Sequence, residues 1–156
     1  MSDLLRLALP QLAPKWLSRE AGVKQVVETI KTAQKNDANL IVFSESFLPG
    51  YPFWLDGTGG AQFNNDRQKI IFAHYSDQAI IIEAGHLDPI CRALKTAKMA
   101  CYLGIIERAS DSQGIRYIVH MFILTKPAQF SPFTGNFNPH MKNCLLYTSP
   151  SPRDRG

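Results

Sequence analysis

The chain has 156 residues, of which 45% are hydrophobic, and it carries a formal net charge of +4. This length and composition suit one globular domain with a core of its own. No run reaches the roughly 18 apolar residues of a membrane span, and Met1–Pro10 lacks the successive regions of a signal peptide. We therefore expect a cytoplasmic protein with no membrane partner. Its three cysteines lack metal-type spacing, which favours free thiols.

The positive charge is confined to the end of the chain. Residues 1–114 hold 12 basic and 12 acidic side chains, whereas residues 115–156 hold five basic side chains against Asp154 alone. A nucleic-acid-binding protein usually carries a basic patch on its folded part. The neutral first 114 residues therefore argue against a nucleic-acid partner.

The first part of the chain shows strand and helix patterns in turn. The apolar run Leu4–Leu12 predicts a strand that Pro10 interrupts. Ser18–Lys35 predicts an amphipathic helix with Ser18 as its N-cap and valines at helical spacing. The continuous apolar run Asn39–Phe43 predicts a buried strand. This order of strand, helix and strand is typical of an α/β fold.

Further elements follow a loop at Leu48–Asn65, which is rich in Pro, Gly, Asp and Asn. We expect a helix at Asp66–Tyr75 and a second helix at Asp88–Lys98, which has a proline in its first turn. The run Ala100–Arg108 then predicts a strand that ends in charge. Ile115–Leu124 is compatible with one more strand.

A carboxylate stands at the end of the second predicted strand, in the stretch "VFSESFLPGYPFW". Active sites of α/β proteins tend to lie on loops beyond the carboxyl ends of strands, which is where Glu45 is placed. We expect the aromatic side chains nearby to desolvate Glu45 and raise its pKa towards that of a general base; these are Phe47, Tyr51, Phe53 and Trp54. The alternative interpretation is a capping or ion-paired glutamate.

The segment "ANLIVFSESFLPGYPFW" resembles the signature around the catalytic glutamate of the nitrilase (carbon–nitrogen hydrolase) superfamily. "LALPQLAP" is similar to the first strand of that family, and the segment that ends in "GIIER" is similar to its "GxxER" strand. The resemblance is closest to the nitrilase branch. It implies a partial α-β-β-α four-layer sandwich for residues 1–114, followed by an irregular C-terminal tail.

The resemblance also implies an activity, the hydrolysis of a small-molecule nitrile to a carboxylic acid and ammonia without metal or organic cofactor. In that family a Cys thiolate attacks the nitrile carbon, a Glu moves protons and a Lys stabilises the developing negative charge. Members commonly form homo-oligomers. Only Glu45 can be assigned by position, as the general base and proton acceptor.

The chain departs from the family pattern in two motifs. No in-frame "HRKLxPT" motif supplies the lysine, and no "CWE" motif supplies the nucleophile. Cys91 and Cys101 are interpreted as core thiols and His86 as a loop or cap residue. As written, the polypeptide is expected to be inactive. An amidase or cyanide-converting enzyme of the same superfamily, and a non-catalytic truncated paralogue, remain alternatives.

Residues 115–143 allow an explanation for the missing lysine motif. Synonymous codons for Arg116–Asn143, read one frame away, permit "HRKLQPTYEE", which contains that motif. We therefore predict that residues 115–143 are an out-of-frame translation following one lost base (or two gained) near Gln113–Ile115. The stretch "CLLYTSPSPRD" resembles a translated sequencing-adapter end, so residues 144–156 are predicted to be a disordered, adapter-derived tail.

Overall fold

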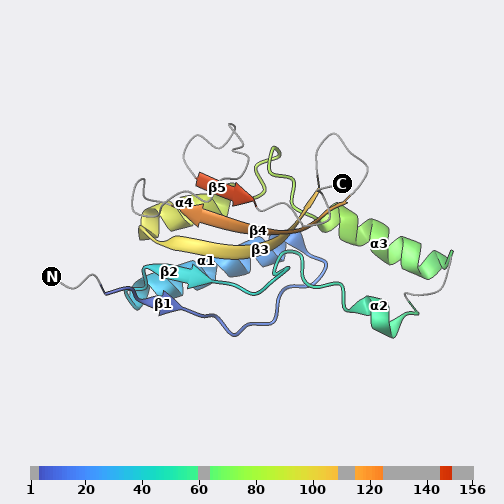
Figure 1. The fold of residues 1–156 in the computed structure, drawn as a ribbon, viewed down its shortest axis with the longest axis horizontal. Helices are drawn as coiled ribbons and strands as arrows, with labels where there is room; N and C mark the ends of the chain where they lie inside the picture. The colour runs from blue at the N-terminus through green and yellow to red at the C-terminus, as the bar shows by residue number, and fades with distance from the viewer. Residues whose placement is uncertain (1–3, 60–63, 109–114, 125–144, 149–156) are drawn as a thin grey trace.

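The computed structural model describes residues 4–59, 64–108, 115–124 and 145–148. Figure 1 shows strands and helices in turn along the chain. The five strands are β1 (Leu7–Ala8), β2 (Leu40–Val42), β3 (Ala100–Arg108), β4 (Ile115–Leu124) and β5 (Leu145–Thr148). The four helices within these ranges are α1 (Arg19–Lys35), α2 (Trp54–Gly57), α3 (Asp66–Gln78) and α4 (Asp88–Ala97).

All five strands belong to one sheet, in the order β1-β2-β3-β4-β5. β1 pairs parallel with β2 and β2 pairs parallel with β3, whereas β4 is antiparallel to both of its neighbours. Parallel neighbours require a crossover, and helices provide it here, as the α/β prediction requires. The fold class is therefore confirmed. Within the described ranges, the structure contains one sheet and one helical layer of the expected sandwich.

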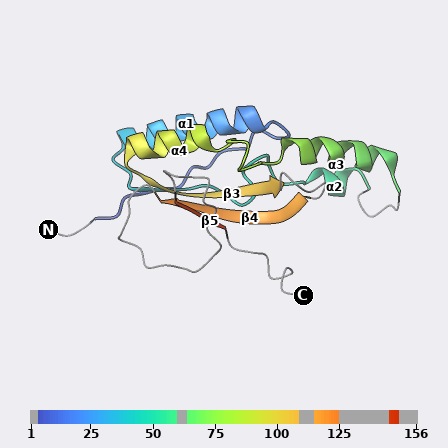
Figure 2. The same ribbon diagram turned by 90° about the horizontal axis from the view of Figure 1, so that it is seen from above.

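The helical layer covers one face of the sheet. Figure 2 shows α1 and α4 side by side above the strands, while α2 and α3 lie beyond one end of the sheet. α1 begins as predicted, because the Ser18 hydroxyl oxygen accepts a hydrogen bond from the Ala21 amide at 3.4 Å. α4 has a proline in its first turn, and it ends at Lys98, which has a left-handed backbone.

The main hydrophobic core lies between this helical layer and the sheet. Val26 and Ile30 of α1, Leu94 of α4, and Leu103 and Ile105 of β3 are all fully buried. Because side chains alternate across a strand, Leu103 and Ile105 face the helices and the intervening Gly104 faces the opposite side. One face of β3 therefore packs against the helices, and the other face carries Gly104.

The structure differs from the sequence prediction in three places. β1 has only two residues, Leu7–Ala8, because the chain approaching Pro10 leaves the ladder. The predicted loop Leu48–Asn65 contains the short helix α2. Leu145–Thr148, within the stretch predicted to be disordered, forms β5 by pairing with β4. Residues 125–144 and 149–156 of the predicted tail lie outside the described residues.

We expect Leu94→Ala to lower the free energy of unfolding by about 2–5 kcal/mol, because it leaves a cavity between α4 and β3. Urea unfolding followed by far-UV circular dichroism measures the change. Lys95→Ala is the matched control, since Lys95 is exposed on the same helix. A loss in L94A no larger than that in K95A would contradict the described packing.

Candidate active site

Glu45 lies in a tight turn immediately after β2. The Phe43 amide still donates to the Tyr102 carbonyl of β3 at 2.8 Å, and after the turn the Leu48 amide donates to the Gly104 carbonyl at 3.2 Å. From Val42 to Leu48 the chain advances six positions, while the β3 residues paired with them, Tyr102 and Ile105, are three apart. The three additional residues form the turn, and Glu45 is one of them.

This turn lies directly on β3 at Gly104. A Cβ atom added to Gly104 would stand 2.5 Å from the Ser46 amide nitrogen, 2.6 Å from the Ser44 carbonyl oxygen and 2.7 Å from Glu45 Cα. Real Cβ atoms essentially never approach other atoms that closely. The contact therefore depends on a glycine at position 104, on the face of β3 opposite the helices.

Tyr102 is a titratable side chain whose pKa is affected by the charge of Glu45. Burial, and then the negative charge of Glu45, raise the pKa of the Tyr102 hydroxyl. Tyr102 lies two positions before Gly104 and on the same face of β3. Sequence reasoning missed both residues, because their relation to Glu45 depends on the register between β2 and β3.

The expected desolvation of Glu45 by aromatic residues is wrong for the described part of the chain, because Glu45 is exposed. Phe47 turns into the core and packs against Phe43, with ring centroids 4.9 Å apart. Phe53 lies against Trp16 with centroids 3.5 Å apart. The aromatic residues after Glu45 thus stabilise the turn region and the core.

The Pro49–Gly50 segment is fixed from two sides. The Leu17 amide donates to the Pro49 carbonyl at 3.0 Å, and the buried Tyr75 hydroxyl donates to the Gly50 carbonyl at 3.0 Å. Gly50 has a φ of 105°, which side-chain-bearing residues rarely adopt, and a Cβ there would meet the Trp16 ring at 2.2 Å. The glycine in "GYP" is therefore required by the backbone and by Trp16.

Ser46 is a buried polar residue that sequence reasoning also missed. It is fully buried and has a left-handed φ of 51°. Its hydroxyl oxygen has no hydrogen-bond partner among the described residues. Neither feature can be predicted from the letters "SES", because both depend on how the turn packs in the folded chain.

The described cysteines lie away from Glu45. Cys101 is fully buried in the core between β3 and the helices, and burial, with a smaller effect of Cys91, raises the pKa of its thiol far above the usual range. Cys91 lies on α4 and is partly buried against the same core. Interpreting both as core thiols is consistent with these positions.

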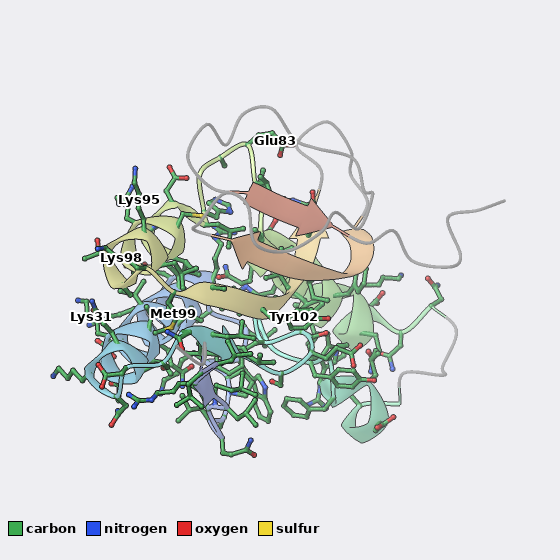
Figure 3. All side chains as sticks on the ribbon, turned by 60° about the vertical axis from the view of Figure 1, so that its left-hand side comes forward. Lys31, Glu83, Lys95, Lys98, Met99 and Tyr102 are labelled. Atoms are coloured by element: carbon green, nitrogen blue, oxygen red, sulfur yellow. The ribbon has the colours of Figure 1, made fainter. Side chains whose placement is uncertain are left out.

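Other candidates for acid–base or metal chemistry are also accounted for. His86 accepts a hydrogen bond from the Ile81 amide at 2.9 Å through Nδ1, as a loop residue does; burial, then Arg19 and Arg108, lower the pKa of His86. Figure 3 shows Lys31 and Lys95 pointing outward from the helical layer. No cluster of three potential metal ligands occurs within the described residues.

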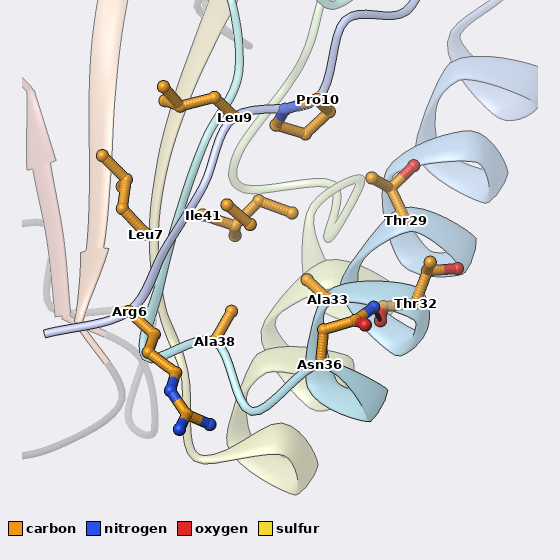
Figure 4. A pocket seen from close by; sticks show the side chains of 11 residues that line it. Arg6, Leu7, Leu9, Pro10, Thr29, Thr32, Ala33, Asn36, Ala38 and Ile41 are labelled. Carbon is orange, nitrogen blue, oxygen red and sulfur yellow. Dashed lines mark hydrogen bonds between the residues drawn. The ribbon is translucent and has the colours of Figure 1, made fainter.

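A separate cavity of about 510 Å³ lies between β1 and α1. Figure 4 shows that it is lined by the chain around β1, including Leu7, and by the last turns and C-cap of α1, including Thr29 and Asn36. Leu7 and Leu9 are exposed beside it. None of the residues of the Glu45 turn lines this cavity, so it is distinct from the candidate active site.

Comparisons with known proteins agree with the sequence resemblance. The sequence model of the carbon-nitrogen hydrolase family matches residues 6–138. An arylacetonitrilase of Arthroderma benhamiae is 31% identical over 122 residues, which are 78% of this chain and 34% of that protein. A cyanide hydratase of Armillaria gallica is 29% identical over 119 residues, which are 75% of this chain and 32% of that protein.

A solved structure, an amidase from Nesterenkonia sp., is 15% identical with a TM-score of 0.48, covering 76% of this chain and 37% of the amidase. At that score the likeness adds nothing to the assignment. The chain spans about a third of the length of the curated relatives it matches. None of the helices in the described ranges is long and apolar enough to cross a membrane.

We expect Tyr75→Phe to lower the free energy of unfolding at pH 7 by about 1–3 kcal/mol, because it leaves the Gly50 carbonyl without its buried donor. Burial, then Tyr51, raise the pKa of Tyr75 above its unfolded value. This contribution to stability is therefore complete below about pH 10 and is lost as the pH rises through the folded-state pKa. Urea unfolding at neutral and at alkaline pH measures both effects.

Tyr51→Phe is the control for this prediction, because Tyr51 is 56% exposed. We expect it to change the stability at pH 7 by less than about 0.5 kcal/mol. Equal stabilities of Y75F and Y51F would contradict the assigned hydrogen bond.

Proposed function

Because the chain belongs to the carbon-nitrogen hydrolase family, we propose that the protein hydrolyses an organic nitrile to a carboxylic acid and ammonia, with Glu45 as the general base. The main support for this proposal is that Glu45 lies on a turn that follows β2 and contacts Gly104 of β3. A carboxylate on such a turn projects from the edge where parallel strands end, which is the usual place for α/β active sites.

The rigidity of the turn supports a catalytic role over a capping role. Backbone hydrogen bonds to β3 fix the turn at Phe43 and Leu48, and the contact with Gly104 fixes it from below. Glu45 forms no ion pair within 4 Å among the described residues. A positioned carboxylate that is not used in an ion pair is available to move protons.

The proposed reaction uses a thiol that the described residues do not place beside Glu45. Glu45 accepts the thiol proton as sulfur bonds to the nitrile carbon, and the nitrogen takes up a proton to give a thioimidate. One water adds and ammonia leaves, giving a thioester, and a second water releases the acid and restores the thiol. We propose that the charge-stabilising lysine comes from the restored reading frame of the segment now read as residues 115–143, and that the nucleophile comes from in-frame sequence beyond that segment.

The substrate class follows from the relatives only as a proposal. Arylacetonitrilases and a cyanide hydratase are among the similar proteins. An arylacetonitrile is therefore our first choice of substrate, and cyanide is the second. The products separate these alternatives, because a nitrilase releases acid and ammonia whereas a hydratase stops at the amide.

We predict that resequencing the source DNA from the codon of Arg108 past that of Cys144 restores one base near Gln113, so that the frame continues through "HRKL" to a "CWE"-like motif. The family match to residue 138 and the pairing of β4 both extend beyond Gln113. The DNA sequence is therefore the measurement that tests the frameshift. An unchanged sequence would refute the frameshift and leave a chain without the catalytic lysine and cysteine.

In the full-length enzyme, we expect Glu45→Gln to reduce the rate of ammonia release from phenylacetonitrile by at least about 10²–10⁴-fold, because the amide cannot accept the thiol proton. Single-turnover and steady-state assays measure the loss. Glu28→Gln, an exposed change on α1, is the control and should retain full activity. Activity of E45Q equal to that of E28Q would overturn the assignment of Glu45.

A further inference from the structure

Gly104 begins the "GIIER" segment of β3, and the proposed reaction gives this residue no task. Its position is unusual in the described structure, because the atoms nearest to its missing side chain are all backbone atoms of Ser44, Glu45 and Ser46. A flexible side chain could move aside for a new methyl group by rotating, whereas these backbone atoms can make room only if the whole turn is displaced from β3. Gly104 therefore controls how closely the Glu45 turn approaches β3.

The close approach is also connected with strain in the turn. Ser46 has the left-handed φ of 51° and is fully buried, and its carbonyl accepts a hydrogen bond from the Gly50 amide at 3.0 Å. A left-handed backbone at a residue with a side chain is strained. Such a conformation persists when its surroundings fix it, and here the surroundings are β3 below and the Pro49–Gly50 segment beyond.

We propose that Gly104 is a positioning residue for Glu45: the missing side chain lets the Ser44–Ser46 turn lie on β3 and thereby holds the Glu45 carboxylate beside Tyr102. The influence of Glu45 on Tyr102 is consistent with this placement. The catalytic meaning of the position rests on the proposed function. The position itself does not, and it can be measured in this chain without any activity.

The test uses Tyr102 as a reporter of Glu45. In the present chain labelled with ¹³Cζ-tyrosine, the Tyr102 resonance should shift as carboxyl groups titrate through about pH 3–6. E45Q should remove most of that shift, because it removes the charge that acts on Tyr102. We expect Gly104→Ala to reduce the shift by an amount of the same order, since the methyl group pushes the turn away from β3.

Gly57→Ala is the matched control, because a Cβ at Gly57 would have no atom within 4 Å. G57A should keep the wild-type Tyr102 shift. A wild-type shift in G104A would overturn the proposal, and so would a wild-type shift in E45Q, because Glu45 would then not lie beside Tyr102.

If G104A alone does not fold, the same titration is made on the double variant G104A/S46G. Glycine at position 46 adopts the left-handed backbone without strain and lets the turn readjust over the new methyl group. A reduced Tyr102 shift in the double variant would support the proposal, and a wild-type shift would overturn it. Failure of both variants to fold, beside a folded G57A, would contradict the proposal, because it requires a turn that can move while the strand stays intact.

These outcomes are separate from those of the activity assay. Loss of the Tyr102 shift in G104A together with full activity of E45Q in the full-length enzyme would leave the positioning correct and the catalytic role wrong. In the full-length enzyme, with Glu45 catalytic, G104A should lower kcat more than it raises KM, because it displaces a reacting group without removing a binding contact.

Discussion

The contact between two backbones, that of the Ser44–Ser46 turn and that of β3 at Gly104, is the constraint on which the candidate site depends. Hydrogen bonds between β2 and β3 fix the chain as far as Phe43, and the pairing resumes at Leu48. The residues between Phe43 and Leu48 are not paired with β3, but they still pack against it. A turn that lies on the strand satisfies both conditions, at the cost of a glycine in β3 and a left-handed serine in the turn.

The rest of the described structure supports this contact from the other side. Leu103 and Ile105, which flank Gly104, are fully buried against α1 and α4, so β3 cannot move away from the turn without opening the core. At the far end of β3, Arg108 forms an ion pair with Asp77 of α3 at 3.0 Å. Arg19 of α1 donates to the Asp77 and Ala79 carbonyls at the end of α3. β3, α1 and α3 are thus joined where the strand ends.

Much of the fold could be predicted from the sequence because it depends on local patterns. Ser18 as N-cap, the proline at the start of α4 and the apolar run of β3 are properties of short segments, and each element was found close to its predicted bounds. The position of Glu45 after β2 was predictable for the same reason. Gly104, Tyr102 and Ser46 were not, because their roles result from register between strands that are far apart in the sequence. The expected desolvation of Glu45 by aromatic side chains was wrong for a related reason. The sequence shows that Phe47 and Phe53 are close to Glu45 along the chain, but not that the turn directs Phe47 into the core.

The proposed role of Glu45 as a general base has two separate requirements, which are the position of the carboxylate and the surroundings of the carboxylate. Its position is set by β2, β3 and Gly104, all of which lie within the described residues. Its surroundings are incomplete within the described residues, where Glu45 is exposed. In the proposed reaction, a covered site would exclude water from the thioimidate until hydrolysis. Position and reactivity would then arise from different parts of the chain, the first built into the strands described here and the second complete only when the thiol stands beside Glu45.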